Sequence, residues 1–328
     1  MLDTDFLSAV GDTITTWHVD VEAARLSPFS RLELGTAVQY AWRHPWWLPL
    51  LYVALSDRFS RGGDHHAMAV LGIDSSSGAL SEPIQFLLLD NRPVHLTVNR
   101  RGSLLTIAYN EPSEVSLHRL EQDGRISENN RGALHAGAYA HHVRFSPDEE
   151  SLIVSARGND PEGNRNEDPG SLEIFRIRDS KLERAGTIAP LQGYGFGPRH
   201  VDFRPNSKWM YVSVERQNAL QMFKMRDGTL QTEASFCVAT LQSPQTVVRL
   251  QLAGAIHVSH DGRIDYVAQL GKAESPRPTT LLLERLLHFE SRHCRYKLPT
   301  GRFGSTSVLC IGQDVASCRP NERAQLTP

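Results

Sequence analysis

The chain has 328 residues, and its 35 lysines and arginines nearly balance its 37 aspartates and glutamates, which gives a formal net charge of -2. Because 40% of the residues are hydrophobic, the chain can bury enough apolar surface to fold, and this excludes an intrinsically disordered protein. Without an excess of positive charge to neutralise phosphates, a nucleic-acid-binding protein is not expected either.

A unit of strands and turns recurs along the chain. The copies align on Tyr40, Leu96, Val143, Val201 and Val258, at spacings of 56, 47, 58 and 57 residues. The first strands of the units are predicted at 38–42, 94–98, 141–145, 199–203 and 256–259. The second strands are predicted at 51–54, 105–108, 152–155, 210–213 and 265–268. Third strands are predicted at 68–73, 115–120, 172–177 and 219–224, and 13–20 fits the same position. Pro, Asp, Asn or Gly residues in the connections are typical of tight turns.

Strand units that repeat without intervening helices predict an all-β protein, a β-propeller. A TIM barrel or a doubly wound sheet would need a helix between strands, and no helical period occurs before residue 270. Division of the chain by about 50 residues per blade predicts six or seven blades. Residues 1–270 carry the clear repeats. Residues 271–328 are expected to be degenerate last blades or an irregular tail of the same domain, either through strong divergence or through a foreign sequence such as a shifted reading frame.

Four histidines precede the aligned apolar position of their first strand: His95, His142, His200 and His257. The first strand of each propeller blade lines the central channel, and side chains alternate between faces along a strand. The shared register therefore predicts a ring of four imidazoles at one height. The alternative for each histidine is a structural one, in which it caps its strand and hydrogen-bonds to the neighbouring blade.

Two charged residues lie next to this predicted ring. Arg199 directly precedes His200, and its guanidinium suits bidentate binding of a carboxylate or phosphate; the alternative is a salt bridge between blades. Glu215 ends the second strand of the same unit, where its carboxylate can orient or deprotonate water; the alternative is an ion pair with Arg199 or Arg216. Arg157 occupies the register of Glu215 in another unit and is a further candidate for substrate binding.

Several motifs resemble those of one known family, the lactonase-type seven-bladed propellers, which includes 6-phosphogluconolactonases and 3-carboxy-cis,cis-muconate lactonizing enzymes. They are the Gly-Pro-Arg-His block at 197–206 with 211–215, and the blocks at 93–96, 140–148 and 256–263. The resemblance covers roughly residues 5–269 and implies seven blades. The chain departs from the family pattern at Tyr139, where the family has a histidine, at Leu270, where it commonly has an arginine, and after Gly271, where no last-blade motif occurs.

The resemblance implies a lactonase that hydrolyses a small anionic sugar-acid lactone such as 6-phosphogluconolactone. Either His141 or Glu215 is expected to act as general base for water, while Arg199 and the histidines hold the anion and stabilise the oxyanion. The chemistry requires no metal and no cofactor. The substrate-binding candidates are His95, His142, His200, His257 and Arg157. Two alternatives remain: a carboxy-cis,cis-muconate cyclase that uses the same residues, and a non-catalytic propeller that binds a partner.

The sequence also gives expectations about location and assembly. The longest apolar run, 46–55, is interrupted by Pro49 and is far shorter than the about 20 residues of a membrane-spanning helix. The first residues include Asp3 and Asp5 and no basic segment, so no secretory signal is expected. The four cysteines show no CxxC spacing, which argues against a disulfide scaffold and a structural zinc site. A monomeric cytoplasmic protein is expected, without a membrane partner.

Overall fold

The computed structural model describes residues 5–20, 22–23, 25–45, 48–58, 63–127, 132–205, 208–226, 228–241, 251–259, 261–262, 264–272 and 281–290. These residues form six antiparallel sheets and one short 3-10 turn, Pro190–Gly193. No helix within these ranges is long and apolar enough to cross a membrane. The all-β prediction is therefore confirmed.

Each sheet is a meander of neighbouring strands. The first sheet contains β1 (Asp5–Val10), β2 (Thr13–Asp20) and β3 (Arg25–Glu33), and the second contains β4 (Val38–Arg43), β5 (Leu50–Ser56), β6 (His66–Ile73) and β7 (Leu80–Leu89). The third contains β8 (Pro93–Val98), β9 (Leu104–Asn110), β10 (Ser113–Arg119) and β11 (Ala133–His135), and the fourth contains β12 (Ala140–Phe145), β13 (Ser151–Ala156), β14 (Ser171–Arg178) and β15 (Lys181–Ile188). The fifth contains β16 (Pro198–Phe203), β17 (Trp209–Val214), β18 (Ala219–Arg226) and β19 (Thr229–Ala239), and the last contains β20 (Gln251–Val258), β21 (Ile264–Lys272) and β22 (Leu281–Glu290).

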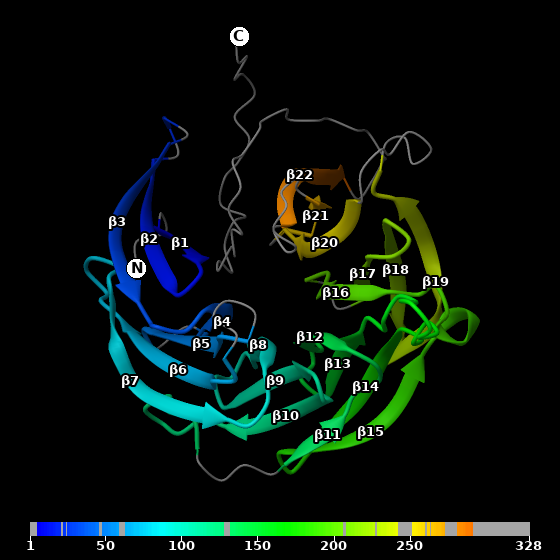
Figure 1. Ribbon diagram of the computed structural model, residues 1–328, viewed down its shortest axis with the longest axis horizontal. Helices are drawn as coiled ribbons and strands as arrows, with labels where there is room; N and C mark the ends of the chain where they lie inside the picture. Colours follow the sequence, from blue (N-terminus) through cyan, green and yellow to red (C-terminus); the bar gives the residue numbers. More distant parts are fainter. Residues whose placement is uncertain are drawn as a thin grey trace.

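The sheets follow one another around a common centre in chain order, as the blades of a propeller do (Figure 1). Strands β4, β8, β12, β16 and β20 lie nearest to the centre, and β3, β7, β15 and β19 lie on the outside. The second strands β5, β9, β13 and β17 are buried on both faces, and all seven residues of β5 are buried. The outer strand β7 instead alternates between partly buried and exposed residues, because one of its faces meets solvent.

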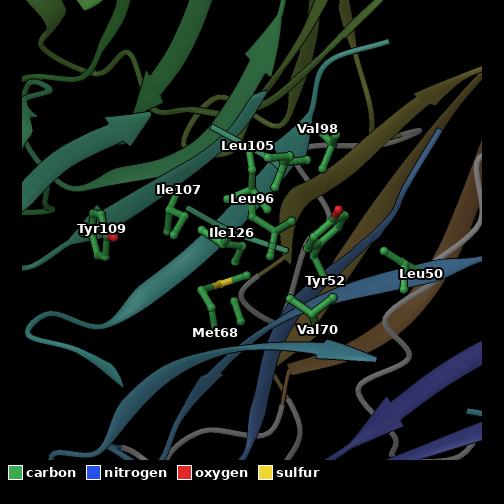
Figure 2. Close-up of a cluster of buried hydrophobic side chains, with 12 residues drawn as sticks. Leu50, Tyr52, Met68, Val70, Leu96, Val98, Leu105, Ile107, Tyr109 and Ile126 are labelled. Carbon is green, nitrogen blue, oxygen red and sulfur yellow. The ribbon is translucent and has the colours of Figure 1, made fainter. Parts of the chain in front are cut away.

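The hydrophobic core lies between neighbouring blades. Figure 2 shows one such cluster, in which side chains of the β4–β7 blade meet those of the β8–β11 blade. Its members include Tyr52, Met68, Leu96, Leu105, Ile107 and Tyr109. Five such clusters lie between sheets that follow one another in the chain, so each of these sheets packs apolar side chains on the next.

A small change in this core is expected to have a measurable cost. Ile107 is completely buried in the cluster of Figure 2, so Ile107→Val should lower the free energy of unfolding by about 0.5–1.5 kcal/mol. The matched control is Ile84→Val on β7, where the side chain is 40% exposed and the change should stay within about 0.5 kcal/mol. Urea unfolding of both variants measures the difference, and equal effects at the two positions would contradict the assignment of the core.

The segment 271–328 is described over two stretches. Strand β21 runs to Lys272, and Leu281–Glu290 forms β22, which pairs with β21 along its whole length. Residues 281–290 of the segment expected to be degenerate last blades or an irregular tail therefore pair with the last described sheet. The rest of it, 273–280 and 291–328, lies outside the described residues.

Candidate active site

The innermost strands of the blades share one irregularity, a β-bulge near their N-terminal end. In β12 the pairing with β13 skips a residue between Ala140 and His142, so His141 is the extra residue. In β16 the same shift makes Arg199 the extra residue before His200. A bulge bends the strand and re-aims a side chain, and bulges are over-represented next to active sites. The repeated bulge thus brings His141 and Arg199 to equivalent positions on neighbouring blades.

A layer of four aromatic rings lies directly beyond the bulges. We call Tyr40, His95, His142 and His200 the histidine layer. Ring centroids are 3.9 Å apart for Tyr40 and His95, 3.9 Å for His95 and His142, and 4.4 Å for His142 and His200. All three histidines are buried. Burial is the main cause that lowers the pKa of each imidazole well below 6.5, so the three rings are neutral at pH 7.

The predicted ring of four histidines is wrong in one member. His257 pairs with Tyr266, and this is the register in which Asp202 pairs with Tyr211. His257 therefore lies two positions further along its strand than His200 and belongs to the next layer. A shift of two residues keeps a side chain on the same face, so the alternation of apolar residues could not reveal it.

Tyr40 takes the fourth position in the histidine layer. It pairs with Ala54 just as His95 pairs with Ala108, whereas the sequence alignment equated Tyr40 with Leu96. The connection from β4 to β5 is one residue longer than the connections β8–β9, β12–β13 and β16–β17, and this moved the alignment by one residue. The aromatic ring fills the space that the histidines occupy in the three following blades.

His257 lies beside a charged pair in the next layer. Arg144 donates to Asp202 across 2.9 Å, and the second oxygen of Asp202 accepts from the backbone N–H of Val258. Asp202 thereby connects three neighbouring blades. His257 keeps an accessible surface, although many protein atoms surround its ring. These atoms exclude water from part of the ring, and this desolvation is the main cause that lowers the pKa of His257. The negative charge of Asp202 raises this pKa, and the positive charge of Arg144 lowers it.

Glu215 lies between two guanidinium groups. Its Oε1 accepts a hydrogen bond from Arg157 across 3.3 Å, and its Oε2 accepts one from Arg199. The carboxylate is almost completely buried, and both arginines are largely buried too. Since both oxygens are already occupied, Glu215 fixes the two guanidinium groups next to each other. The ion pair with Arg199, one of the alternatives from the sequence, is present.

A third arginine and a tyrosine complete this group. The Arg157 guanidinium lies over the ring of Tyr139, 5.2 Å from its centroid, and Arg92 forms a hydrogen bond with Tyr139. Tyr139 has a φ of 58°, in the left-handed region that residues other than glycine rarely adopt. Such strained residues cluster at functional sites, where the surrounding structure holds them in place. We call Arg92, Tyr139, His141, Arg157, Arg199 and Glu215 the arginine cluster.

His141 connects the arginine cluster with the histidine layer. Its ring centroid is 5.5 Å from that of His200, and its Nδ1 is buried without a hydrogen-bond partner among the described residues. Burial is the first cause that lowers its pKa well below 6.5, and the positive charges of Arg199, Arg157 and Arg92 lower it further. A neutral imidazole beside three cations can accept a proton, and an anion bound to those cations would favour its protonated form.

The sequence predicted most of this arrangement but not all of it. His141, Arg157, Arg199 and Glu215 come together, as do His95, His142 and His200. Sequence reasoning missed Arg92 and Tyr40. Arg92 directly precedes β8, just as Tyr139 directly precedes β12. The sequence comparison identified Tyr139 only as a departure from the family motif. A search for charged residues just before each innermost strand would have found Arg92.

The charges of the cluster point to an anionic ligand. The three arginines near His141 face two carboxylates, Glu215, which pairs with Arg157 and Arg199, and Asp160, which lies 3.6 Å from Arg157. One positive charge is left in excess over these residues. Arg199 Nε is buried and has no hydrogen-bond acceptor among the described residues. Guanidinium groups bind carboxylates and phosphates through paired hydrogen bonds. The arrangement can therefore hold an anion next to a neutral imidazole.

Comparison with known proteins gives a family and several relatives. Residues 4–275 match the family described as Lactonase, 7-bladed beta-propeller. The chain is 25% identical to the 6-phosphogluconolactonase of Bacillus subtilis (strain 168) over 215 residues, which are 62% of this chain and 57% of the relative. It is 27% identical to the 6-phosphogluconolactonase of Enterobacter sp. (strain 638) over 53% of this chain and 49% of the relative. The chain thus spans about half the length of the curated relatives that it matches.

Solved structures show the same fold. A protein from Lactobacillus plantarum superposes with a TM-score of 0.68 at 18% identity, and the periplasmic gluconolactonase of Pseudomonas aeruginosa superposes with a TM-score of 0.67 at 17% identity. Each comparison covers 90% of this chain and 81% of the other. The propeller prediction is confirmed by this similarity.

Proposed function

The chain belongs to the lactonase family of seven-bladed β-propellers, and from this premise we propose that it hydrolyses the lactone of a small anionic sugar acid. The observation that carries the proposal is the arginine cluster, in which Arg157 and Arg199 share the carboxylate of Glu215 beside the neutral His141. An anionic substrate needs the cations, and hydrolysis needs a base for water. Both requirements are met within one group of residues.

The mechanism assigns the proton transfer to His141. The neutral imidazole accepts a proton from water, and the water oxygen forms a bond to the lactone carbonyl carbon. The positive charges of the arginine cluster stabilise the negative charge that develops on the carbonyl oxygen. When the bond between the carbonyl carbon and the ring oxygen breaks, the proton held by His141 passes to the leaving oxygen. Lactone and water thus yield the hydroxy acid.

Glu215 is proposed as a positioning residue in this mechanism. The sequence left open whether His141 or Glu215 is the base, and the two ion pairs of Glu215 favour His141. The carboxylate holds Arg157 and Arg199 at a fixed separation, so that little conformational entropy is lost when they bind an anion. The histidines of the layer, and His257 in the next layer, remain candidates for contacts to the polar groups of the sugar.

We propose 6-phosphogluconolactone as the substrate, because the curated relatives carry the name 6-phosphogluconolactonase. The test is the rate of ring opening of this lactone and of glucono-lactone without phosphate, each measured against its uncatalysed rate. The phosphorylated lactone should have the lower KM, since its phosphate can bind the guanidinium groups. Equal KM values would contradict the role given to the arginines, and no acceleration of either lactone would contradict the lactonase proposal.

A lysine in place of Arg199 is expected to weaken substrate binding. Lysine keeps the positive charge but cannot donate two parallel hydrogen bonds as a guanidinium does. Arg199→Lys should therefore raise KM for the phosphorylated lactone at least about tenfold, which is the cost of losing one hydrogen bond to a charged group. Steady-state kinetics measure this effect. The matched control is Arg184→Lys, since Arg184 forms an equivalent ion pair with Glu173 on an outer strand far from His141. A KM that is unchanged in Arg199→Lys would contradict the proposed contact.

Two other functions were expected as alternatives, and two assays separate them from hydrolysis. A muconate cyclase would consume the diene absorbance of a carboxy-cis,cis-muconate. A non-catalytic binding propeller would transform neither substrate and would not be stabilised by lactone analogues in thermal unfolding. The arginine cluster and His141 favour hydrolysis over the binding role. The cytoplasmic location and the monomeric state remain predictions, and one structural neighbour is described as periplasmic.

A further inference from the structure

The histidine layer carries chemistry that hydrolysis of a lactone does not use. We propose that His95, His142 and His200 form a binding site for one divalent transition-metal ion, with Zn²⁺ as the best match. The inference rests on the arrangement of these side chains and does not depend on the lactonase proposal.

The geometry suits a single ion. One ligand nitrogen from each of the three imidazoles lies within 4.8 Å of the other two. In a tetrahedral site with Zn–N distances of about 2.0–2.1 Å, ligand nitrogens lie about 3.4 Å apart. Side-chain rotations that shorten the distances between the ligand nitrogens by at most about 1.4 Å therefore produce this arrangement. The strands β8, β12 and β16, which supply the ligands, are neighbours around the centre (Figure 1).

Buried nitrogens without partners give a second, independent observation. His95 Nε2 and His142 Nδ1 are buried and have no hydrogen-bond partner among the described residues. An unsatisfied buried polar atom destabilises a fold by about 1–3 kcal/mol, so such atoms usually serve a purpose. Coordination through His95 Nε2 moves the ring proton to Nδ1 and gives up the hydrogen bond from the N–H of Val143. At 3.4 Å that bond is long and contributes little.

The surrounding charges permit a cation. Two positive groups act on the ligand histidines, Arg144 on His95 and His142 and Arg199 on His200. Asp202 balances the charge of Arg144 at 2.9 Å, and Glu215 pairs with Arg199. The guanidinium also lies over the ring of Trp42, 4.8 Å from its centroid. The layer itself offers neutral imidazoles and no carboxylate. Nitrogen ligands suit Zn²⁺, Cu²⁺, Fe²⁺ and Ni²⁺, whereas Mg²⁺ and Ca²⁺ prefer oxygen.

Three protein ligands define the type of site. Structural zinc sites use four protein ligands, whereas a site with three histidines keeps a fourth position for water or another small ligand. His141, whose ring centroid is 5.5 Å from that of His200, is a group outside the layer that can contact such a ligand.

The test is direct metal binding to the full-length protein. Protein treated with a chelator and dialysed is titrated with Co²⁺, which gives visible absorption in a tetrahedral site, and Zn²⁺ is then added to displace it. We expect one ion per chain, loss of the cobalt spectrum on addition of Zn²⁺, and no effect of Mg²⁺. Folded protein that takes up no stoichiometric Co²⁺ or Zn²⁺ would overturn the proposal, whatever its activity on lactones.

Matched variants locate the ion. His142→Gln and His200→Gln should each weaken Zn²⁺ binding by more than about 100-fold. The loss of a residue that only hydrogen-bonds to a metal ligand costs about 10–100-fold, and the loss of a ligand itself should cost more. The control is His118→Gln, because His118 is an equally buried histidine on β10 that bonds to Ser116 across 2.8 Å and lies outside the layer. Unchanged affinity in both folded layer variants would overturn the assignment. If they do not fold, paramagnetic broadening of the wild-type histidine ring signals by Co²⁺ decides between these three histidines and others.

Discussion

Replacement of His141 by glutamine is expected to lower kcat for the phosphorylated lactone by about 10²–10⁴-fold, the usual contribution of a general base. Glutamine has a similar size and can hydrogen-bond to water, but it cannot accept a proton. Because Arg199, Arg157 and Glu215 remain in place, KM should change far less than kcat. Steady-state kinetics of the variant give both constants.

The pH profile tests the same role in the wild type. The pKa of His141 lies well below 6.5 because of burial and the neighbouring arginines, so the imidazole stays unprotonated as the pH falls through 6.5. The value of kcat/KM should therefore stay constant through pH 6.5 and fall only at lower pH.

The control for His141→Gln is the variant His44→Gln. His44 is a buried histidine that contacts the carbonyl of Gly102, and its replacement should leave the wild-type kcat unchanged. A kcat within a few-fold of wild type in His141→Gln would exclude this residue as the base.

Asp265→Asn is expected to stabilise the protein at pH 8 by at most about 4 kcal/mol, the free energy of a pKa displaced by about three units. Asp265 on β21 is 3% exposed, and its Oδ1 has no hydrogen-bond partner within the described ranges. Burial, together with the nearby charge of Asp202, raises the pKa of this carboxyl from 3.8 to about 7, although Arg204 opposes the shift. Asparagine keeps the shape and removes the buried charge.

The sign of the effect follows from proton binding. Between pH 4 and 7 the folded state keeps the proton on Asp265 while the unfolded state loses it, so stability falls as the pH rises through this range. The difference between Asp265→Asn and wild type should therefore be small at pH 4 and largest above pH 7. Urea unfolding at several pH values measures it. Asp74→Asn is the contrasting control, because the hydroxyls of Ser76 and Ser77 lower the pKa of Asp74 and its loss should destabilise at neutral pH. A pH-independent difference for Asp265→Asn would contradict the buried charge.

The fold was predictable from the sequence because its signal is local and repeated. Each blade contains short apolar strands that alternate with turn residues, and five copies of the same pattern leave little room for another architecture. The segment 271–328 lacked this pattern, and only the pairing of β22 with β21 shows that residues 281–290 continue the last described sheet.

The candidate site was predictable as a set of residues but not as an arrangement. Equivalent registers correctly grouped His95, His142 and His200, since residues at one height of a repeat come together when the repeats close into a ring. The registers of Tyr40 and His257 depend on hairpin length and on bulges, which alternation of apolar residues does not report.

The sequence by itself determined which side chains each blade presents at its inner strand, because strand periodicity and turn chemistry act within a few residues. Only the tertiary structure decided which of those side chains meet. The pairing of Glu215 with Arg157 joins residues 58 positions apart, and the contact of Arg92 with Tyr139 joins neighbouring blades. The residues in such contacts lie on different blades and are separated in the chain by about one blade. Their relative positions depend on how one blade packs on the next, and local sequence patterns do not contain this information.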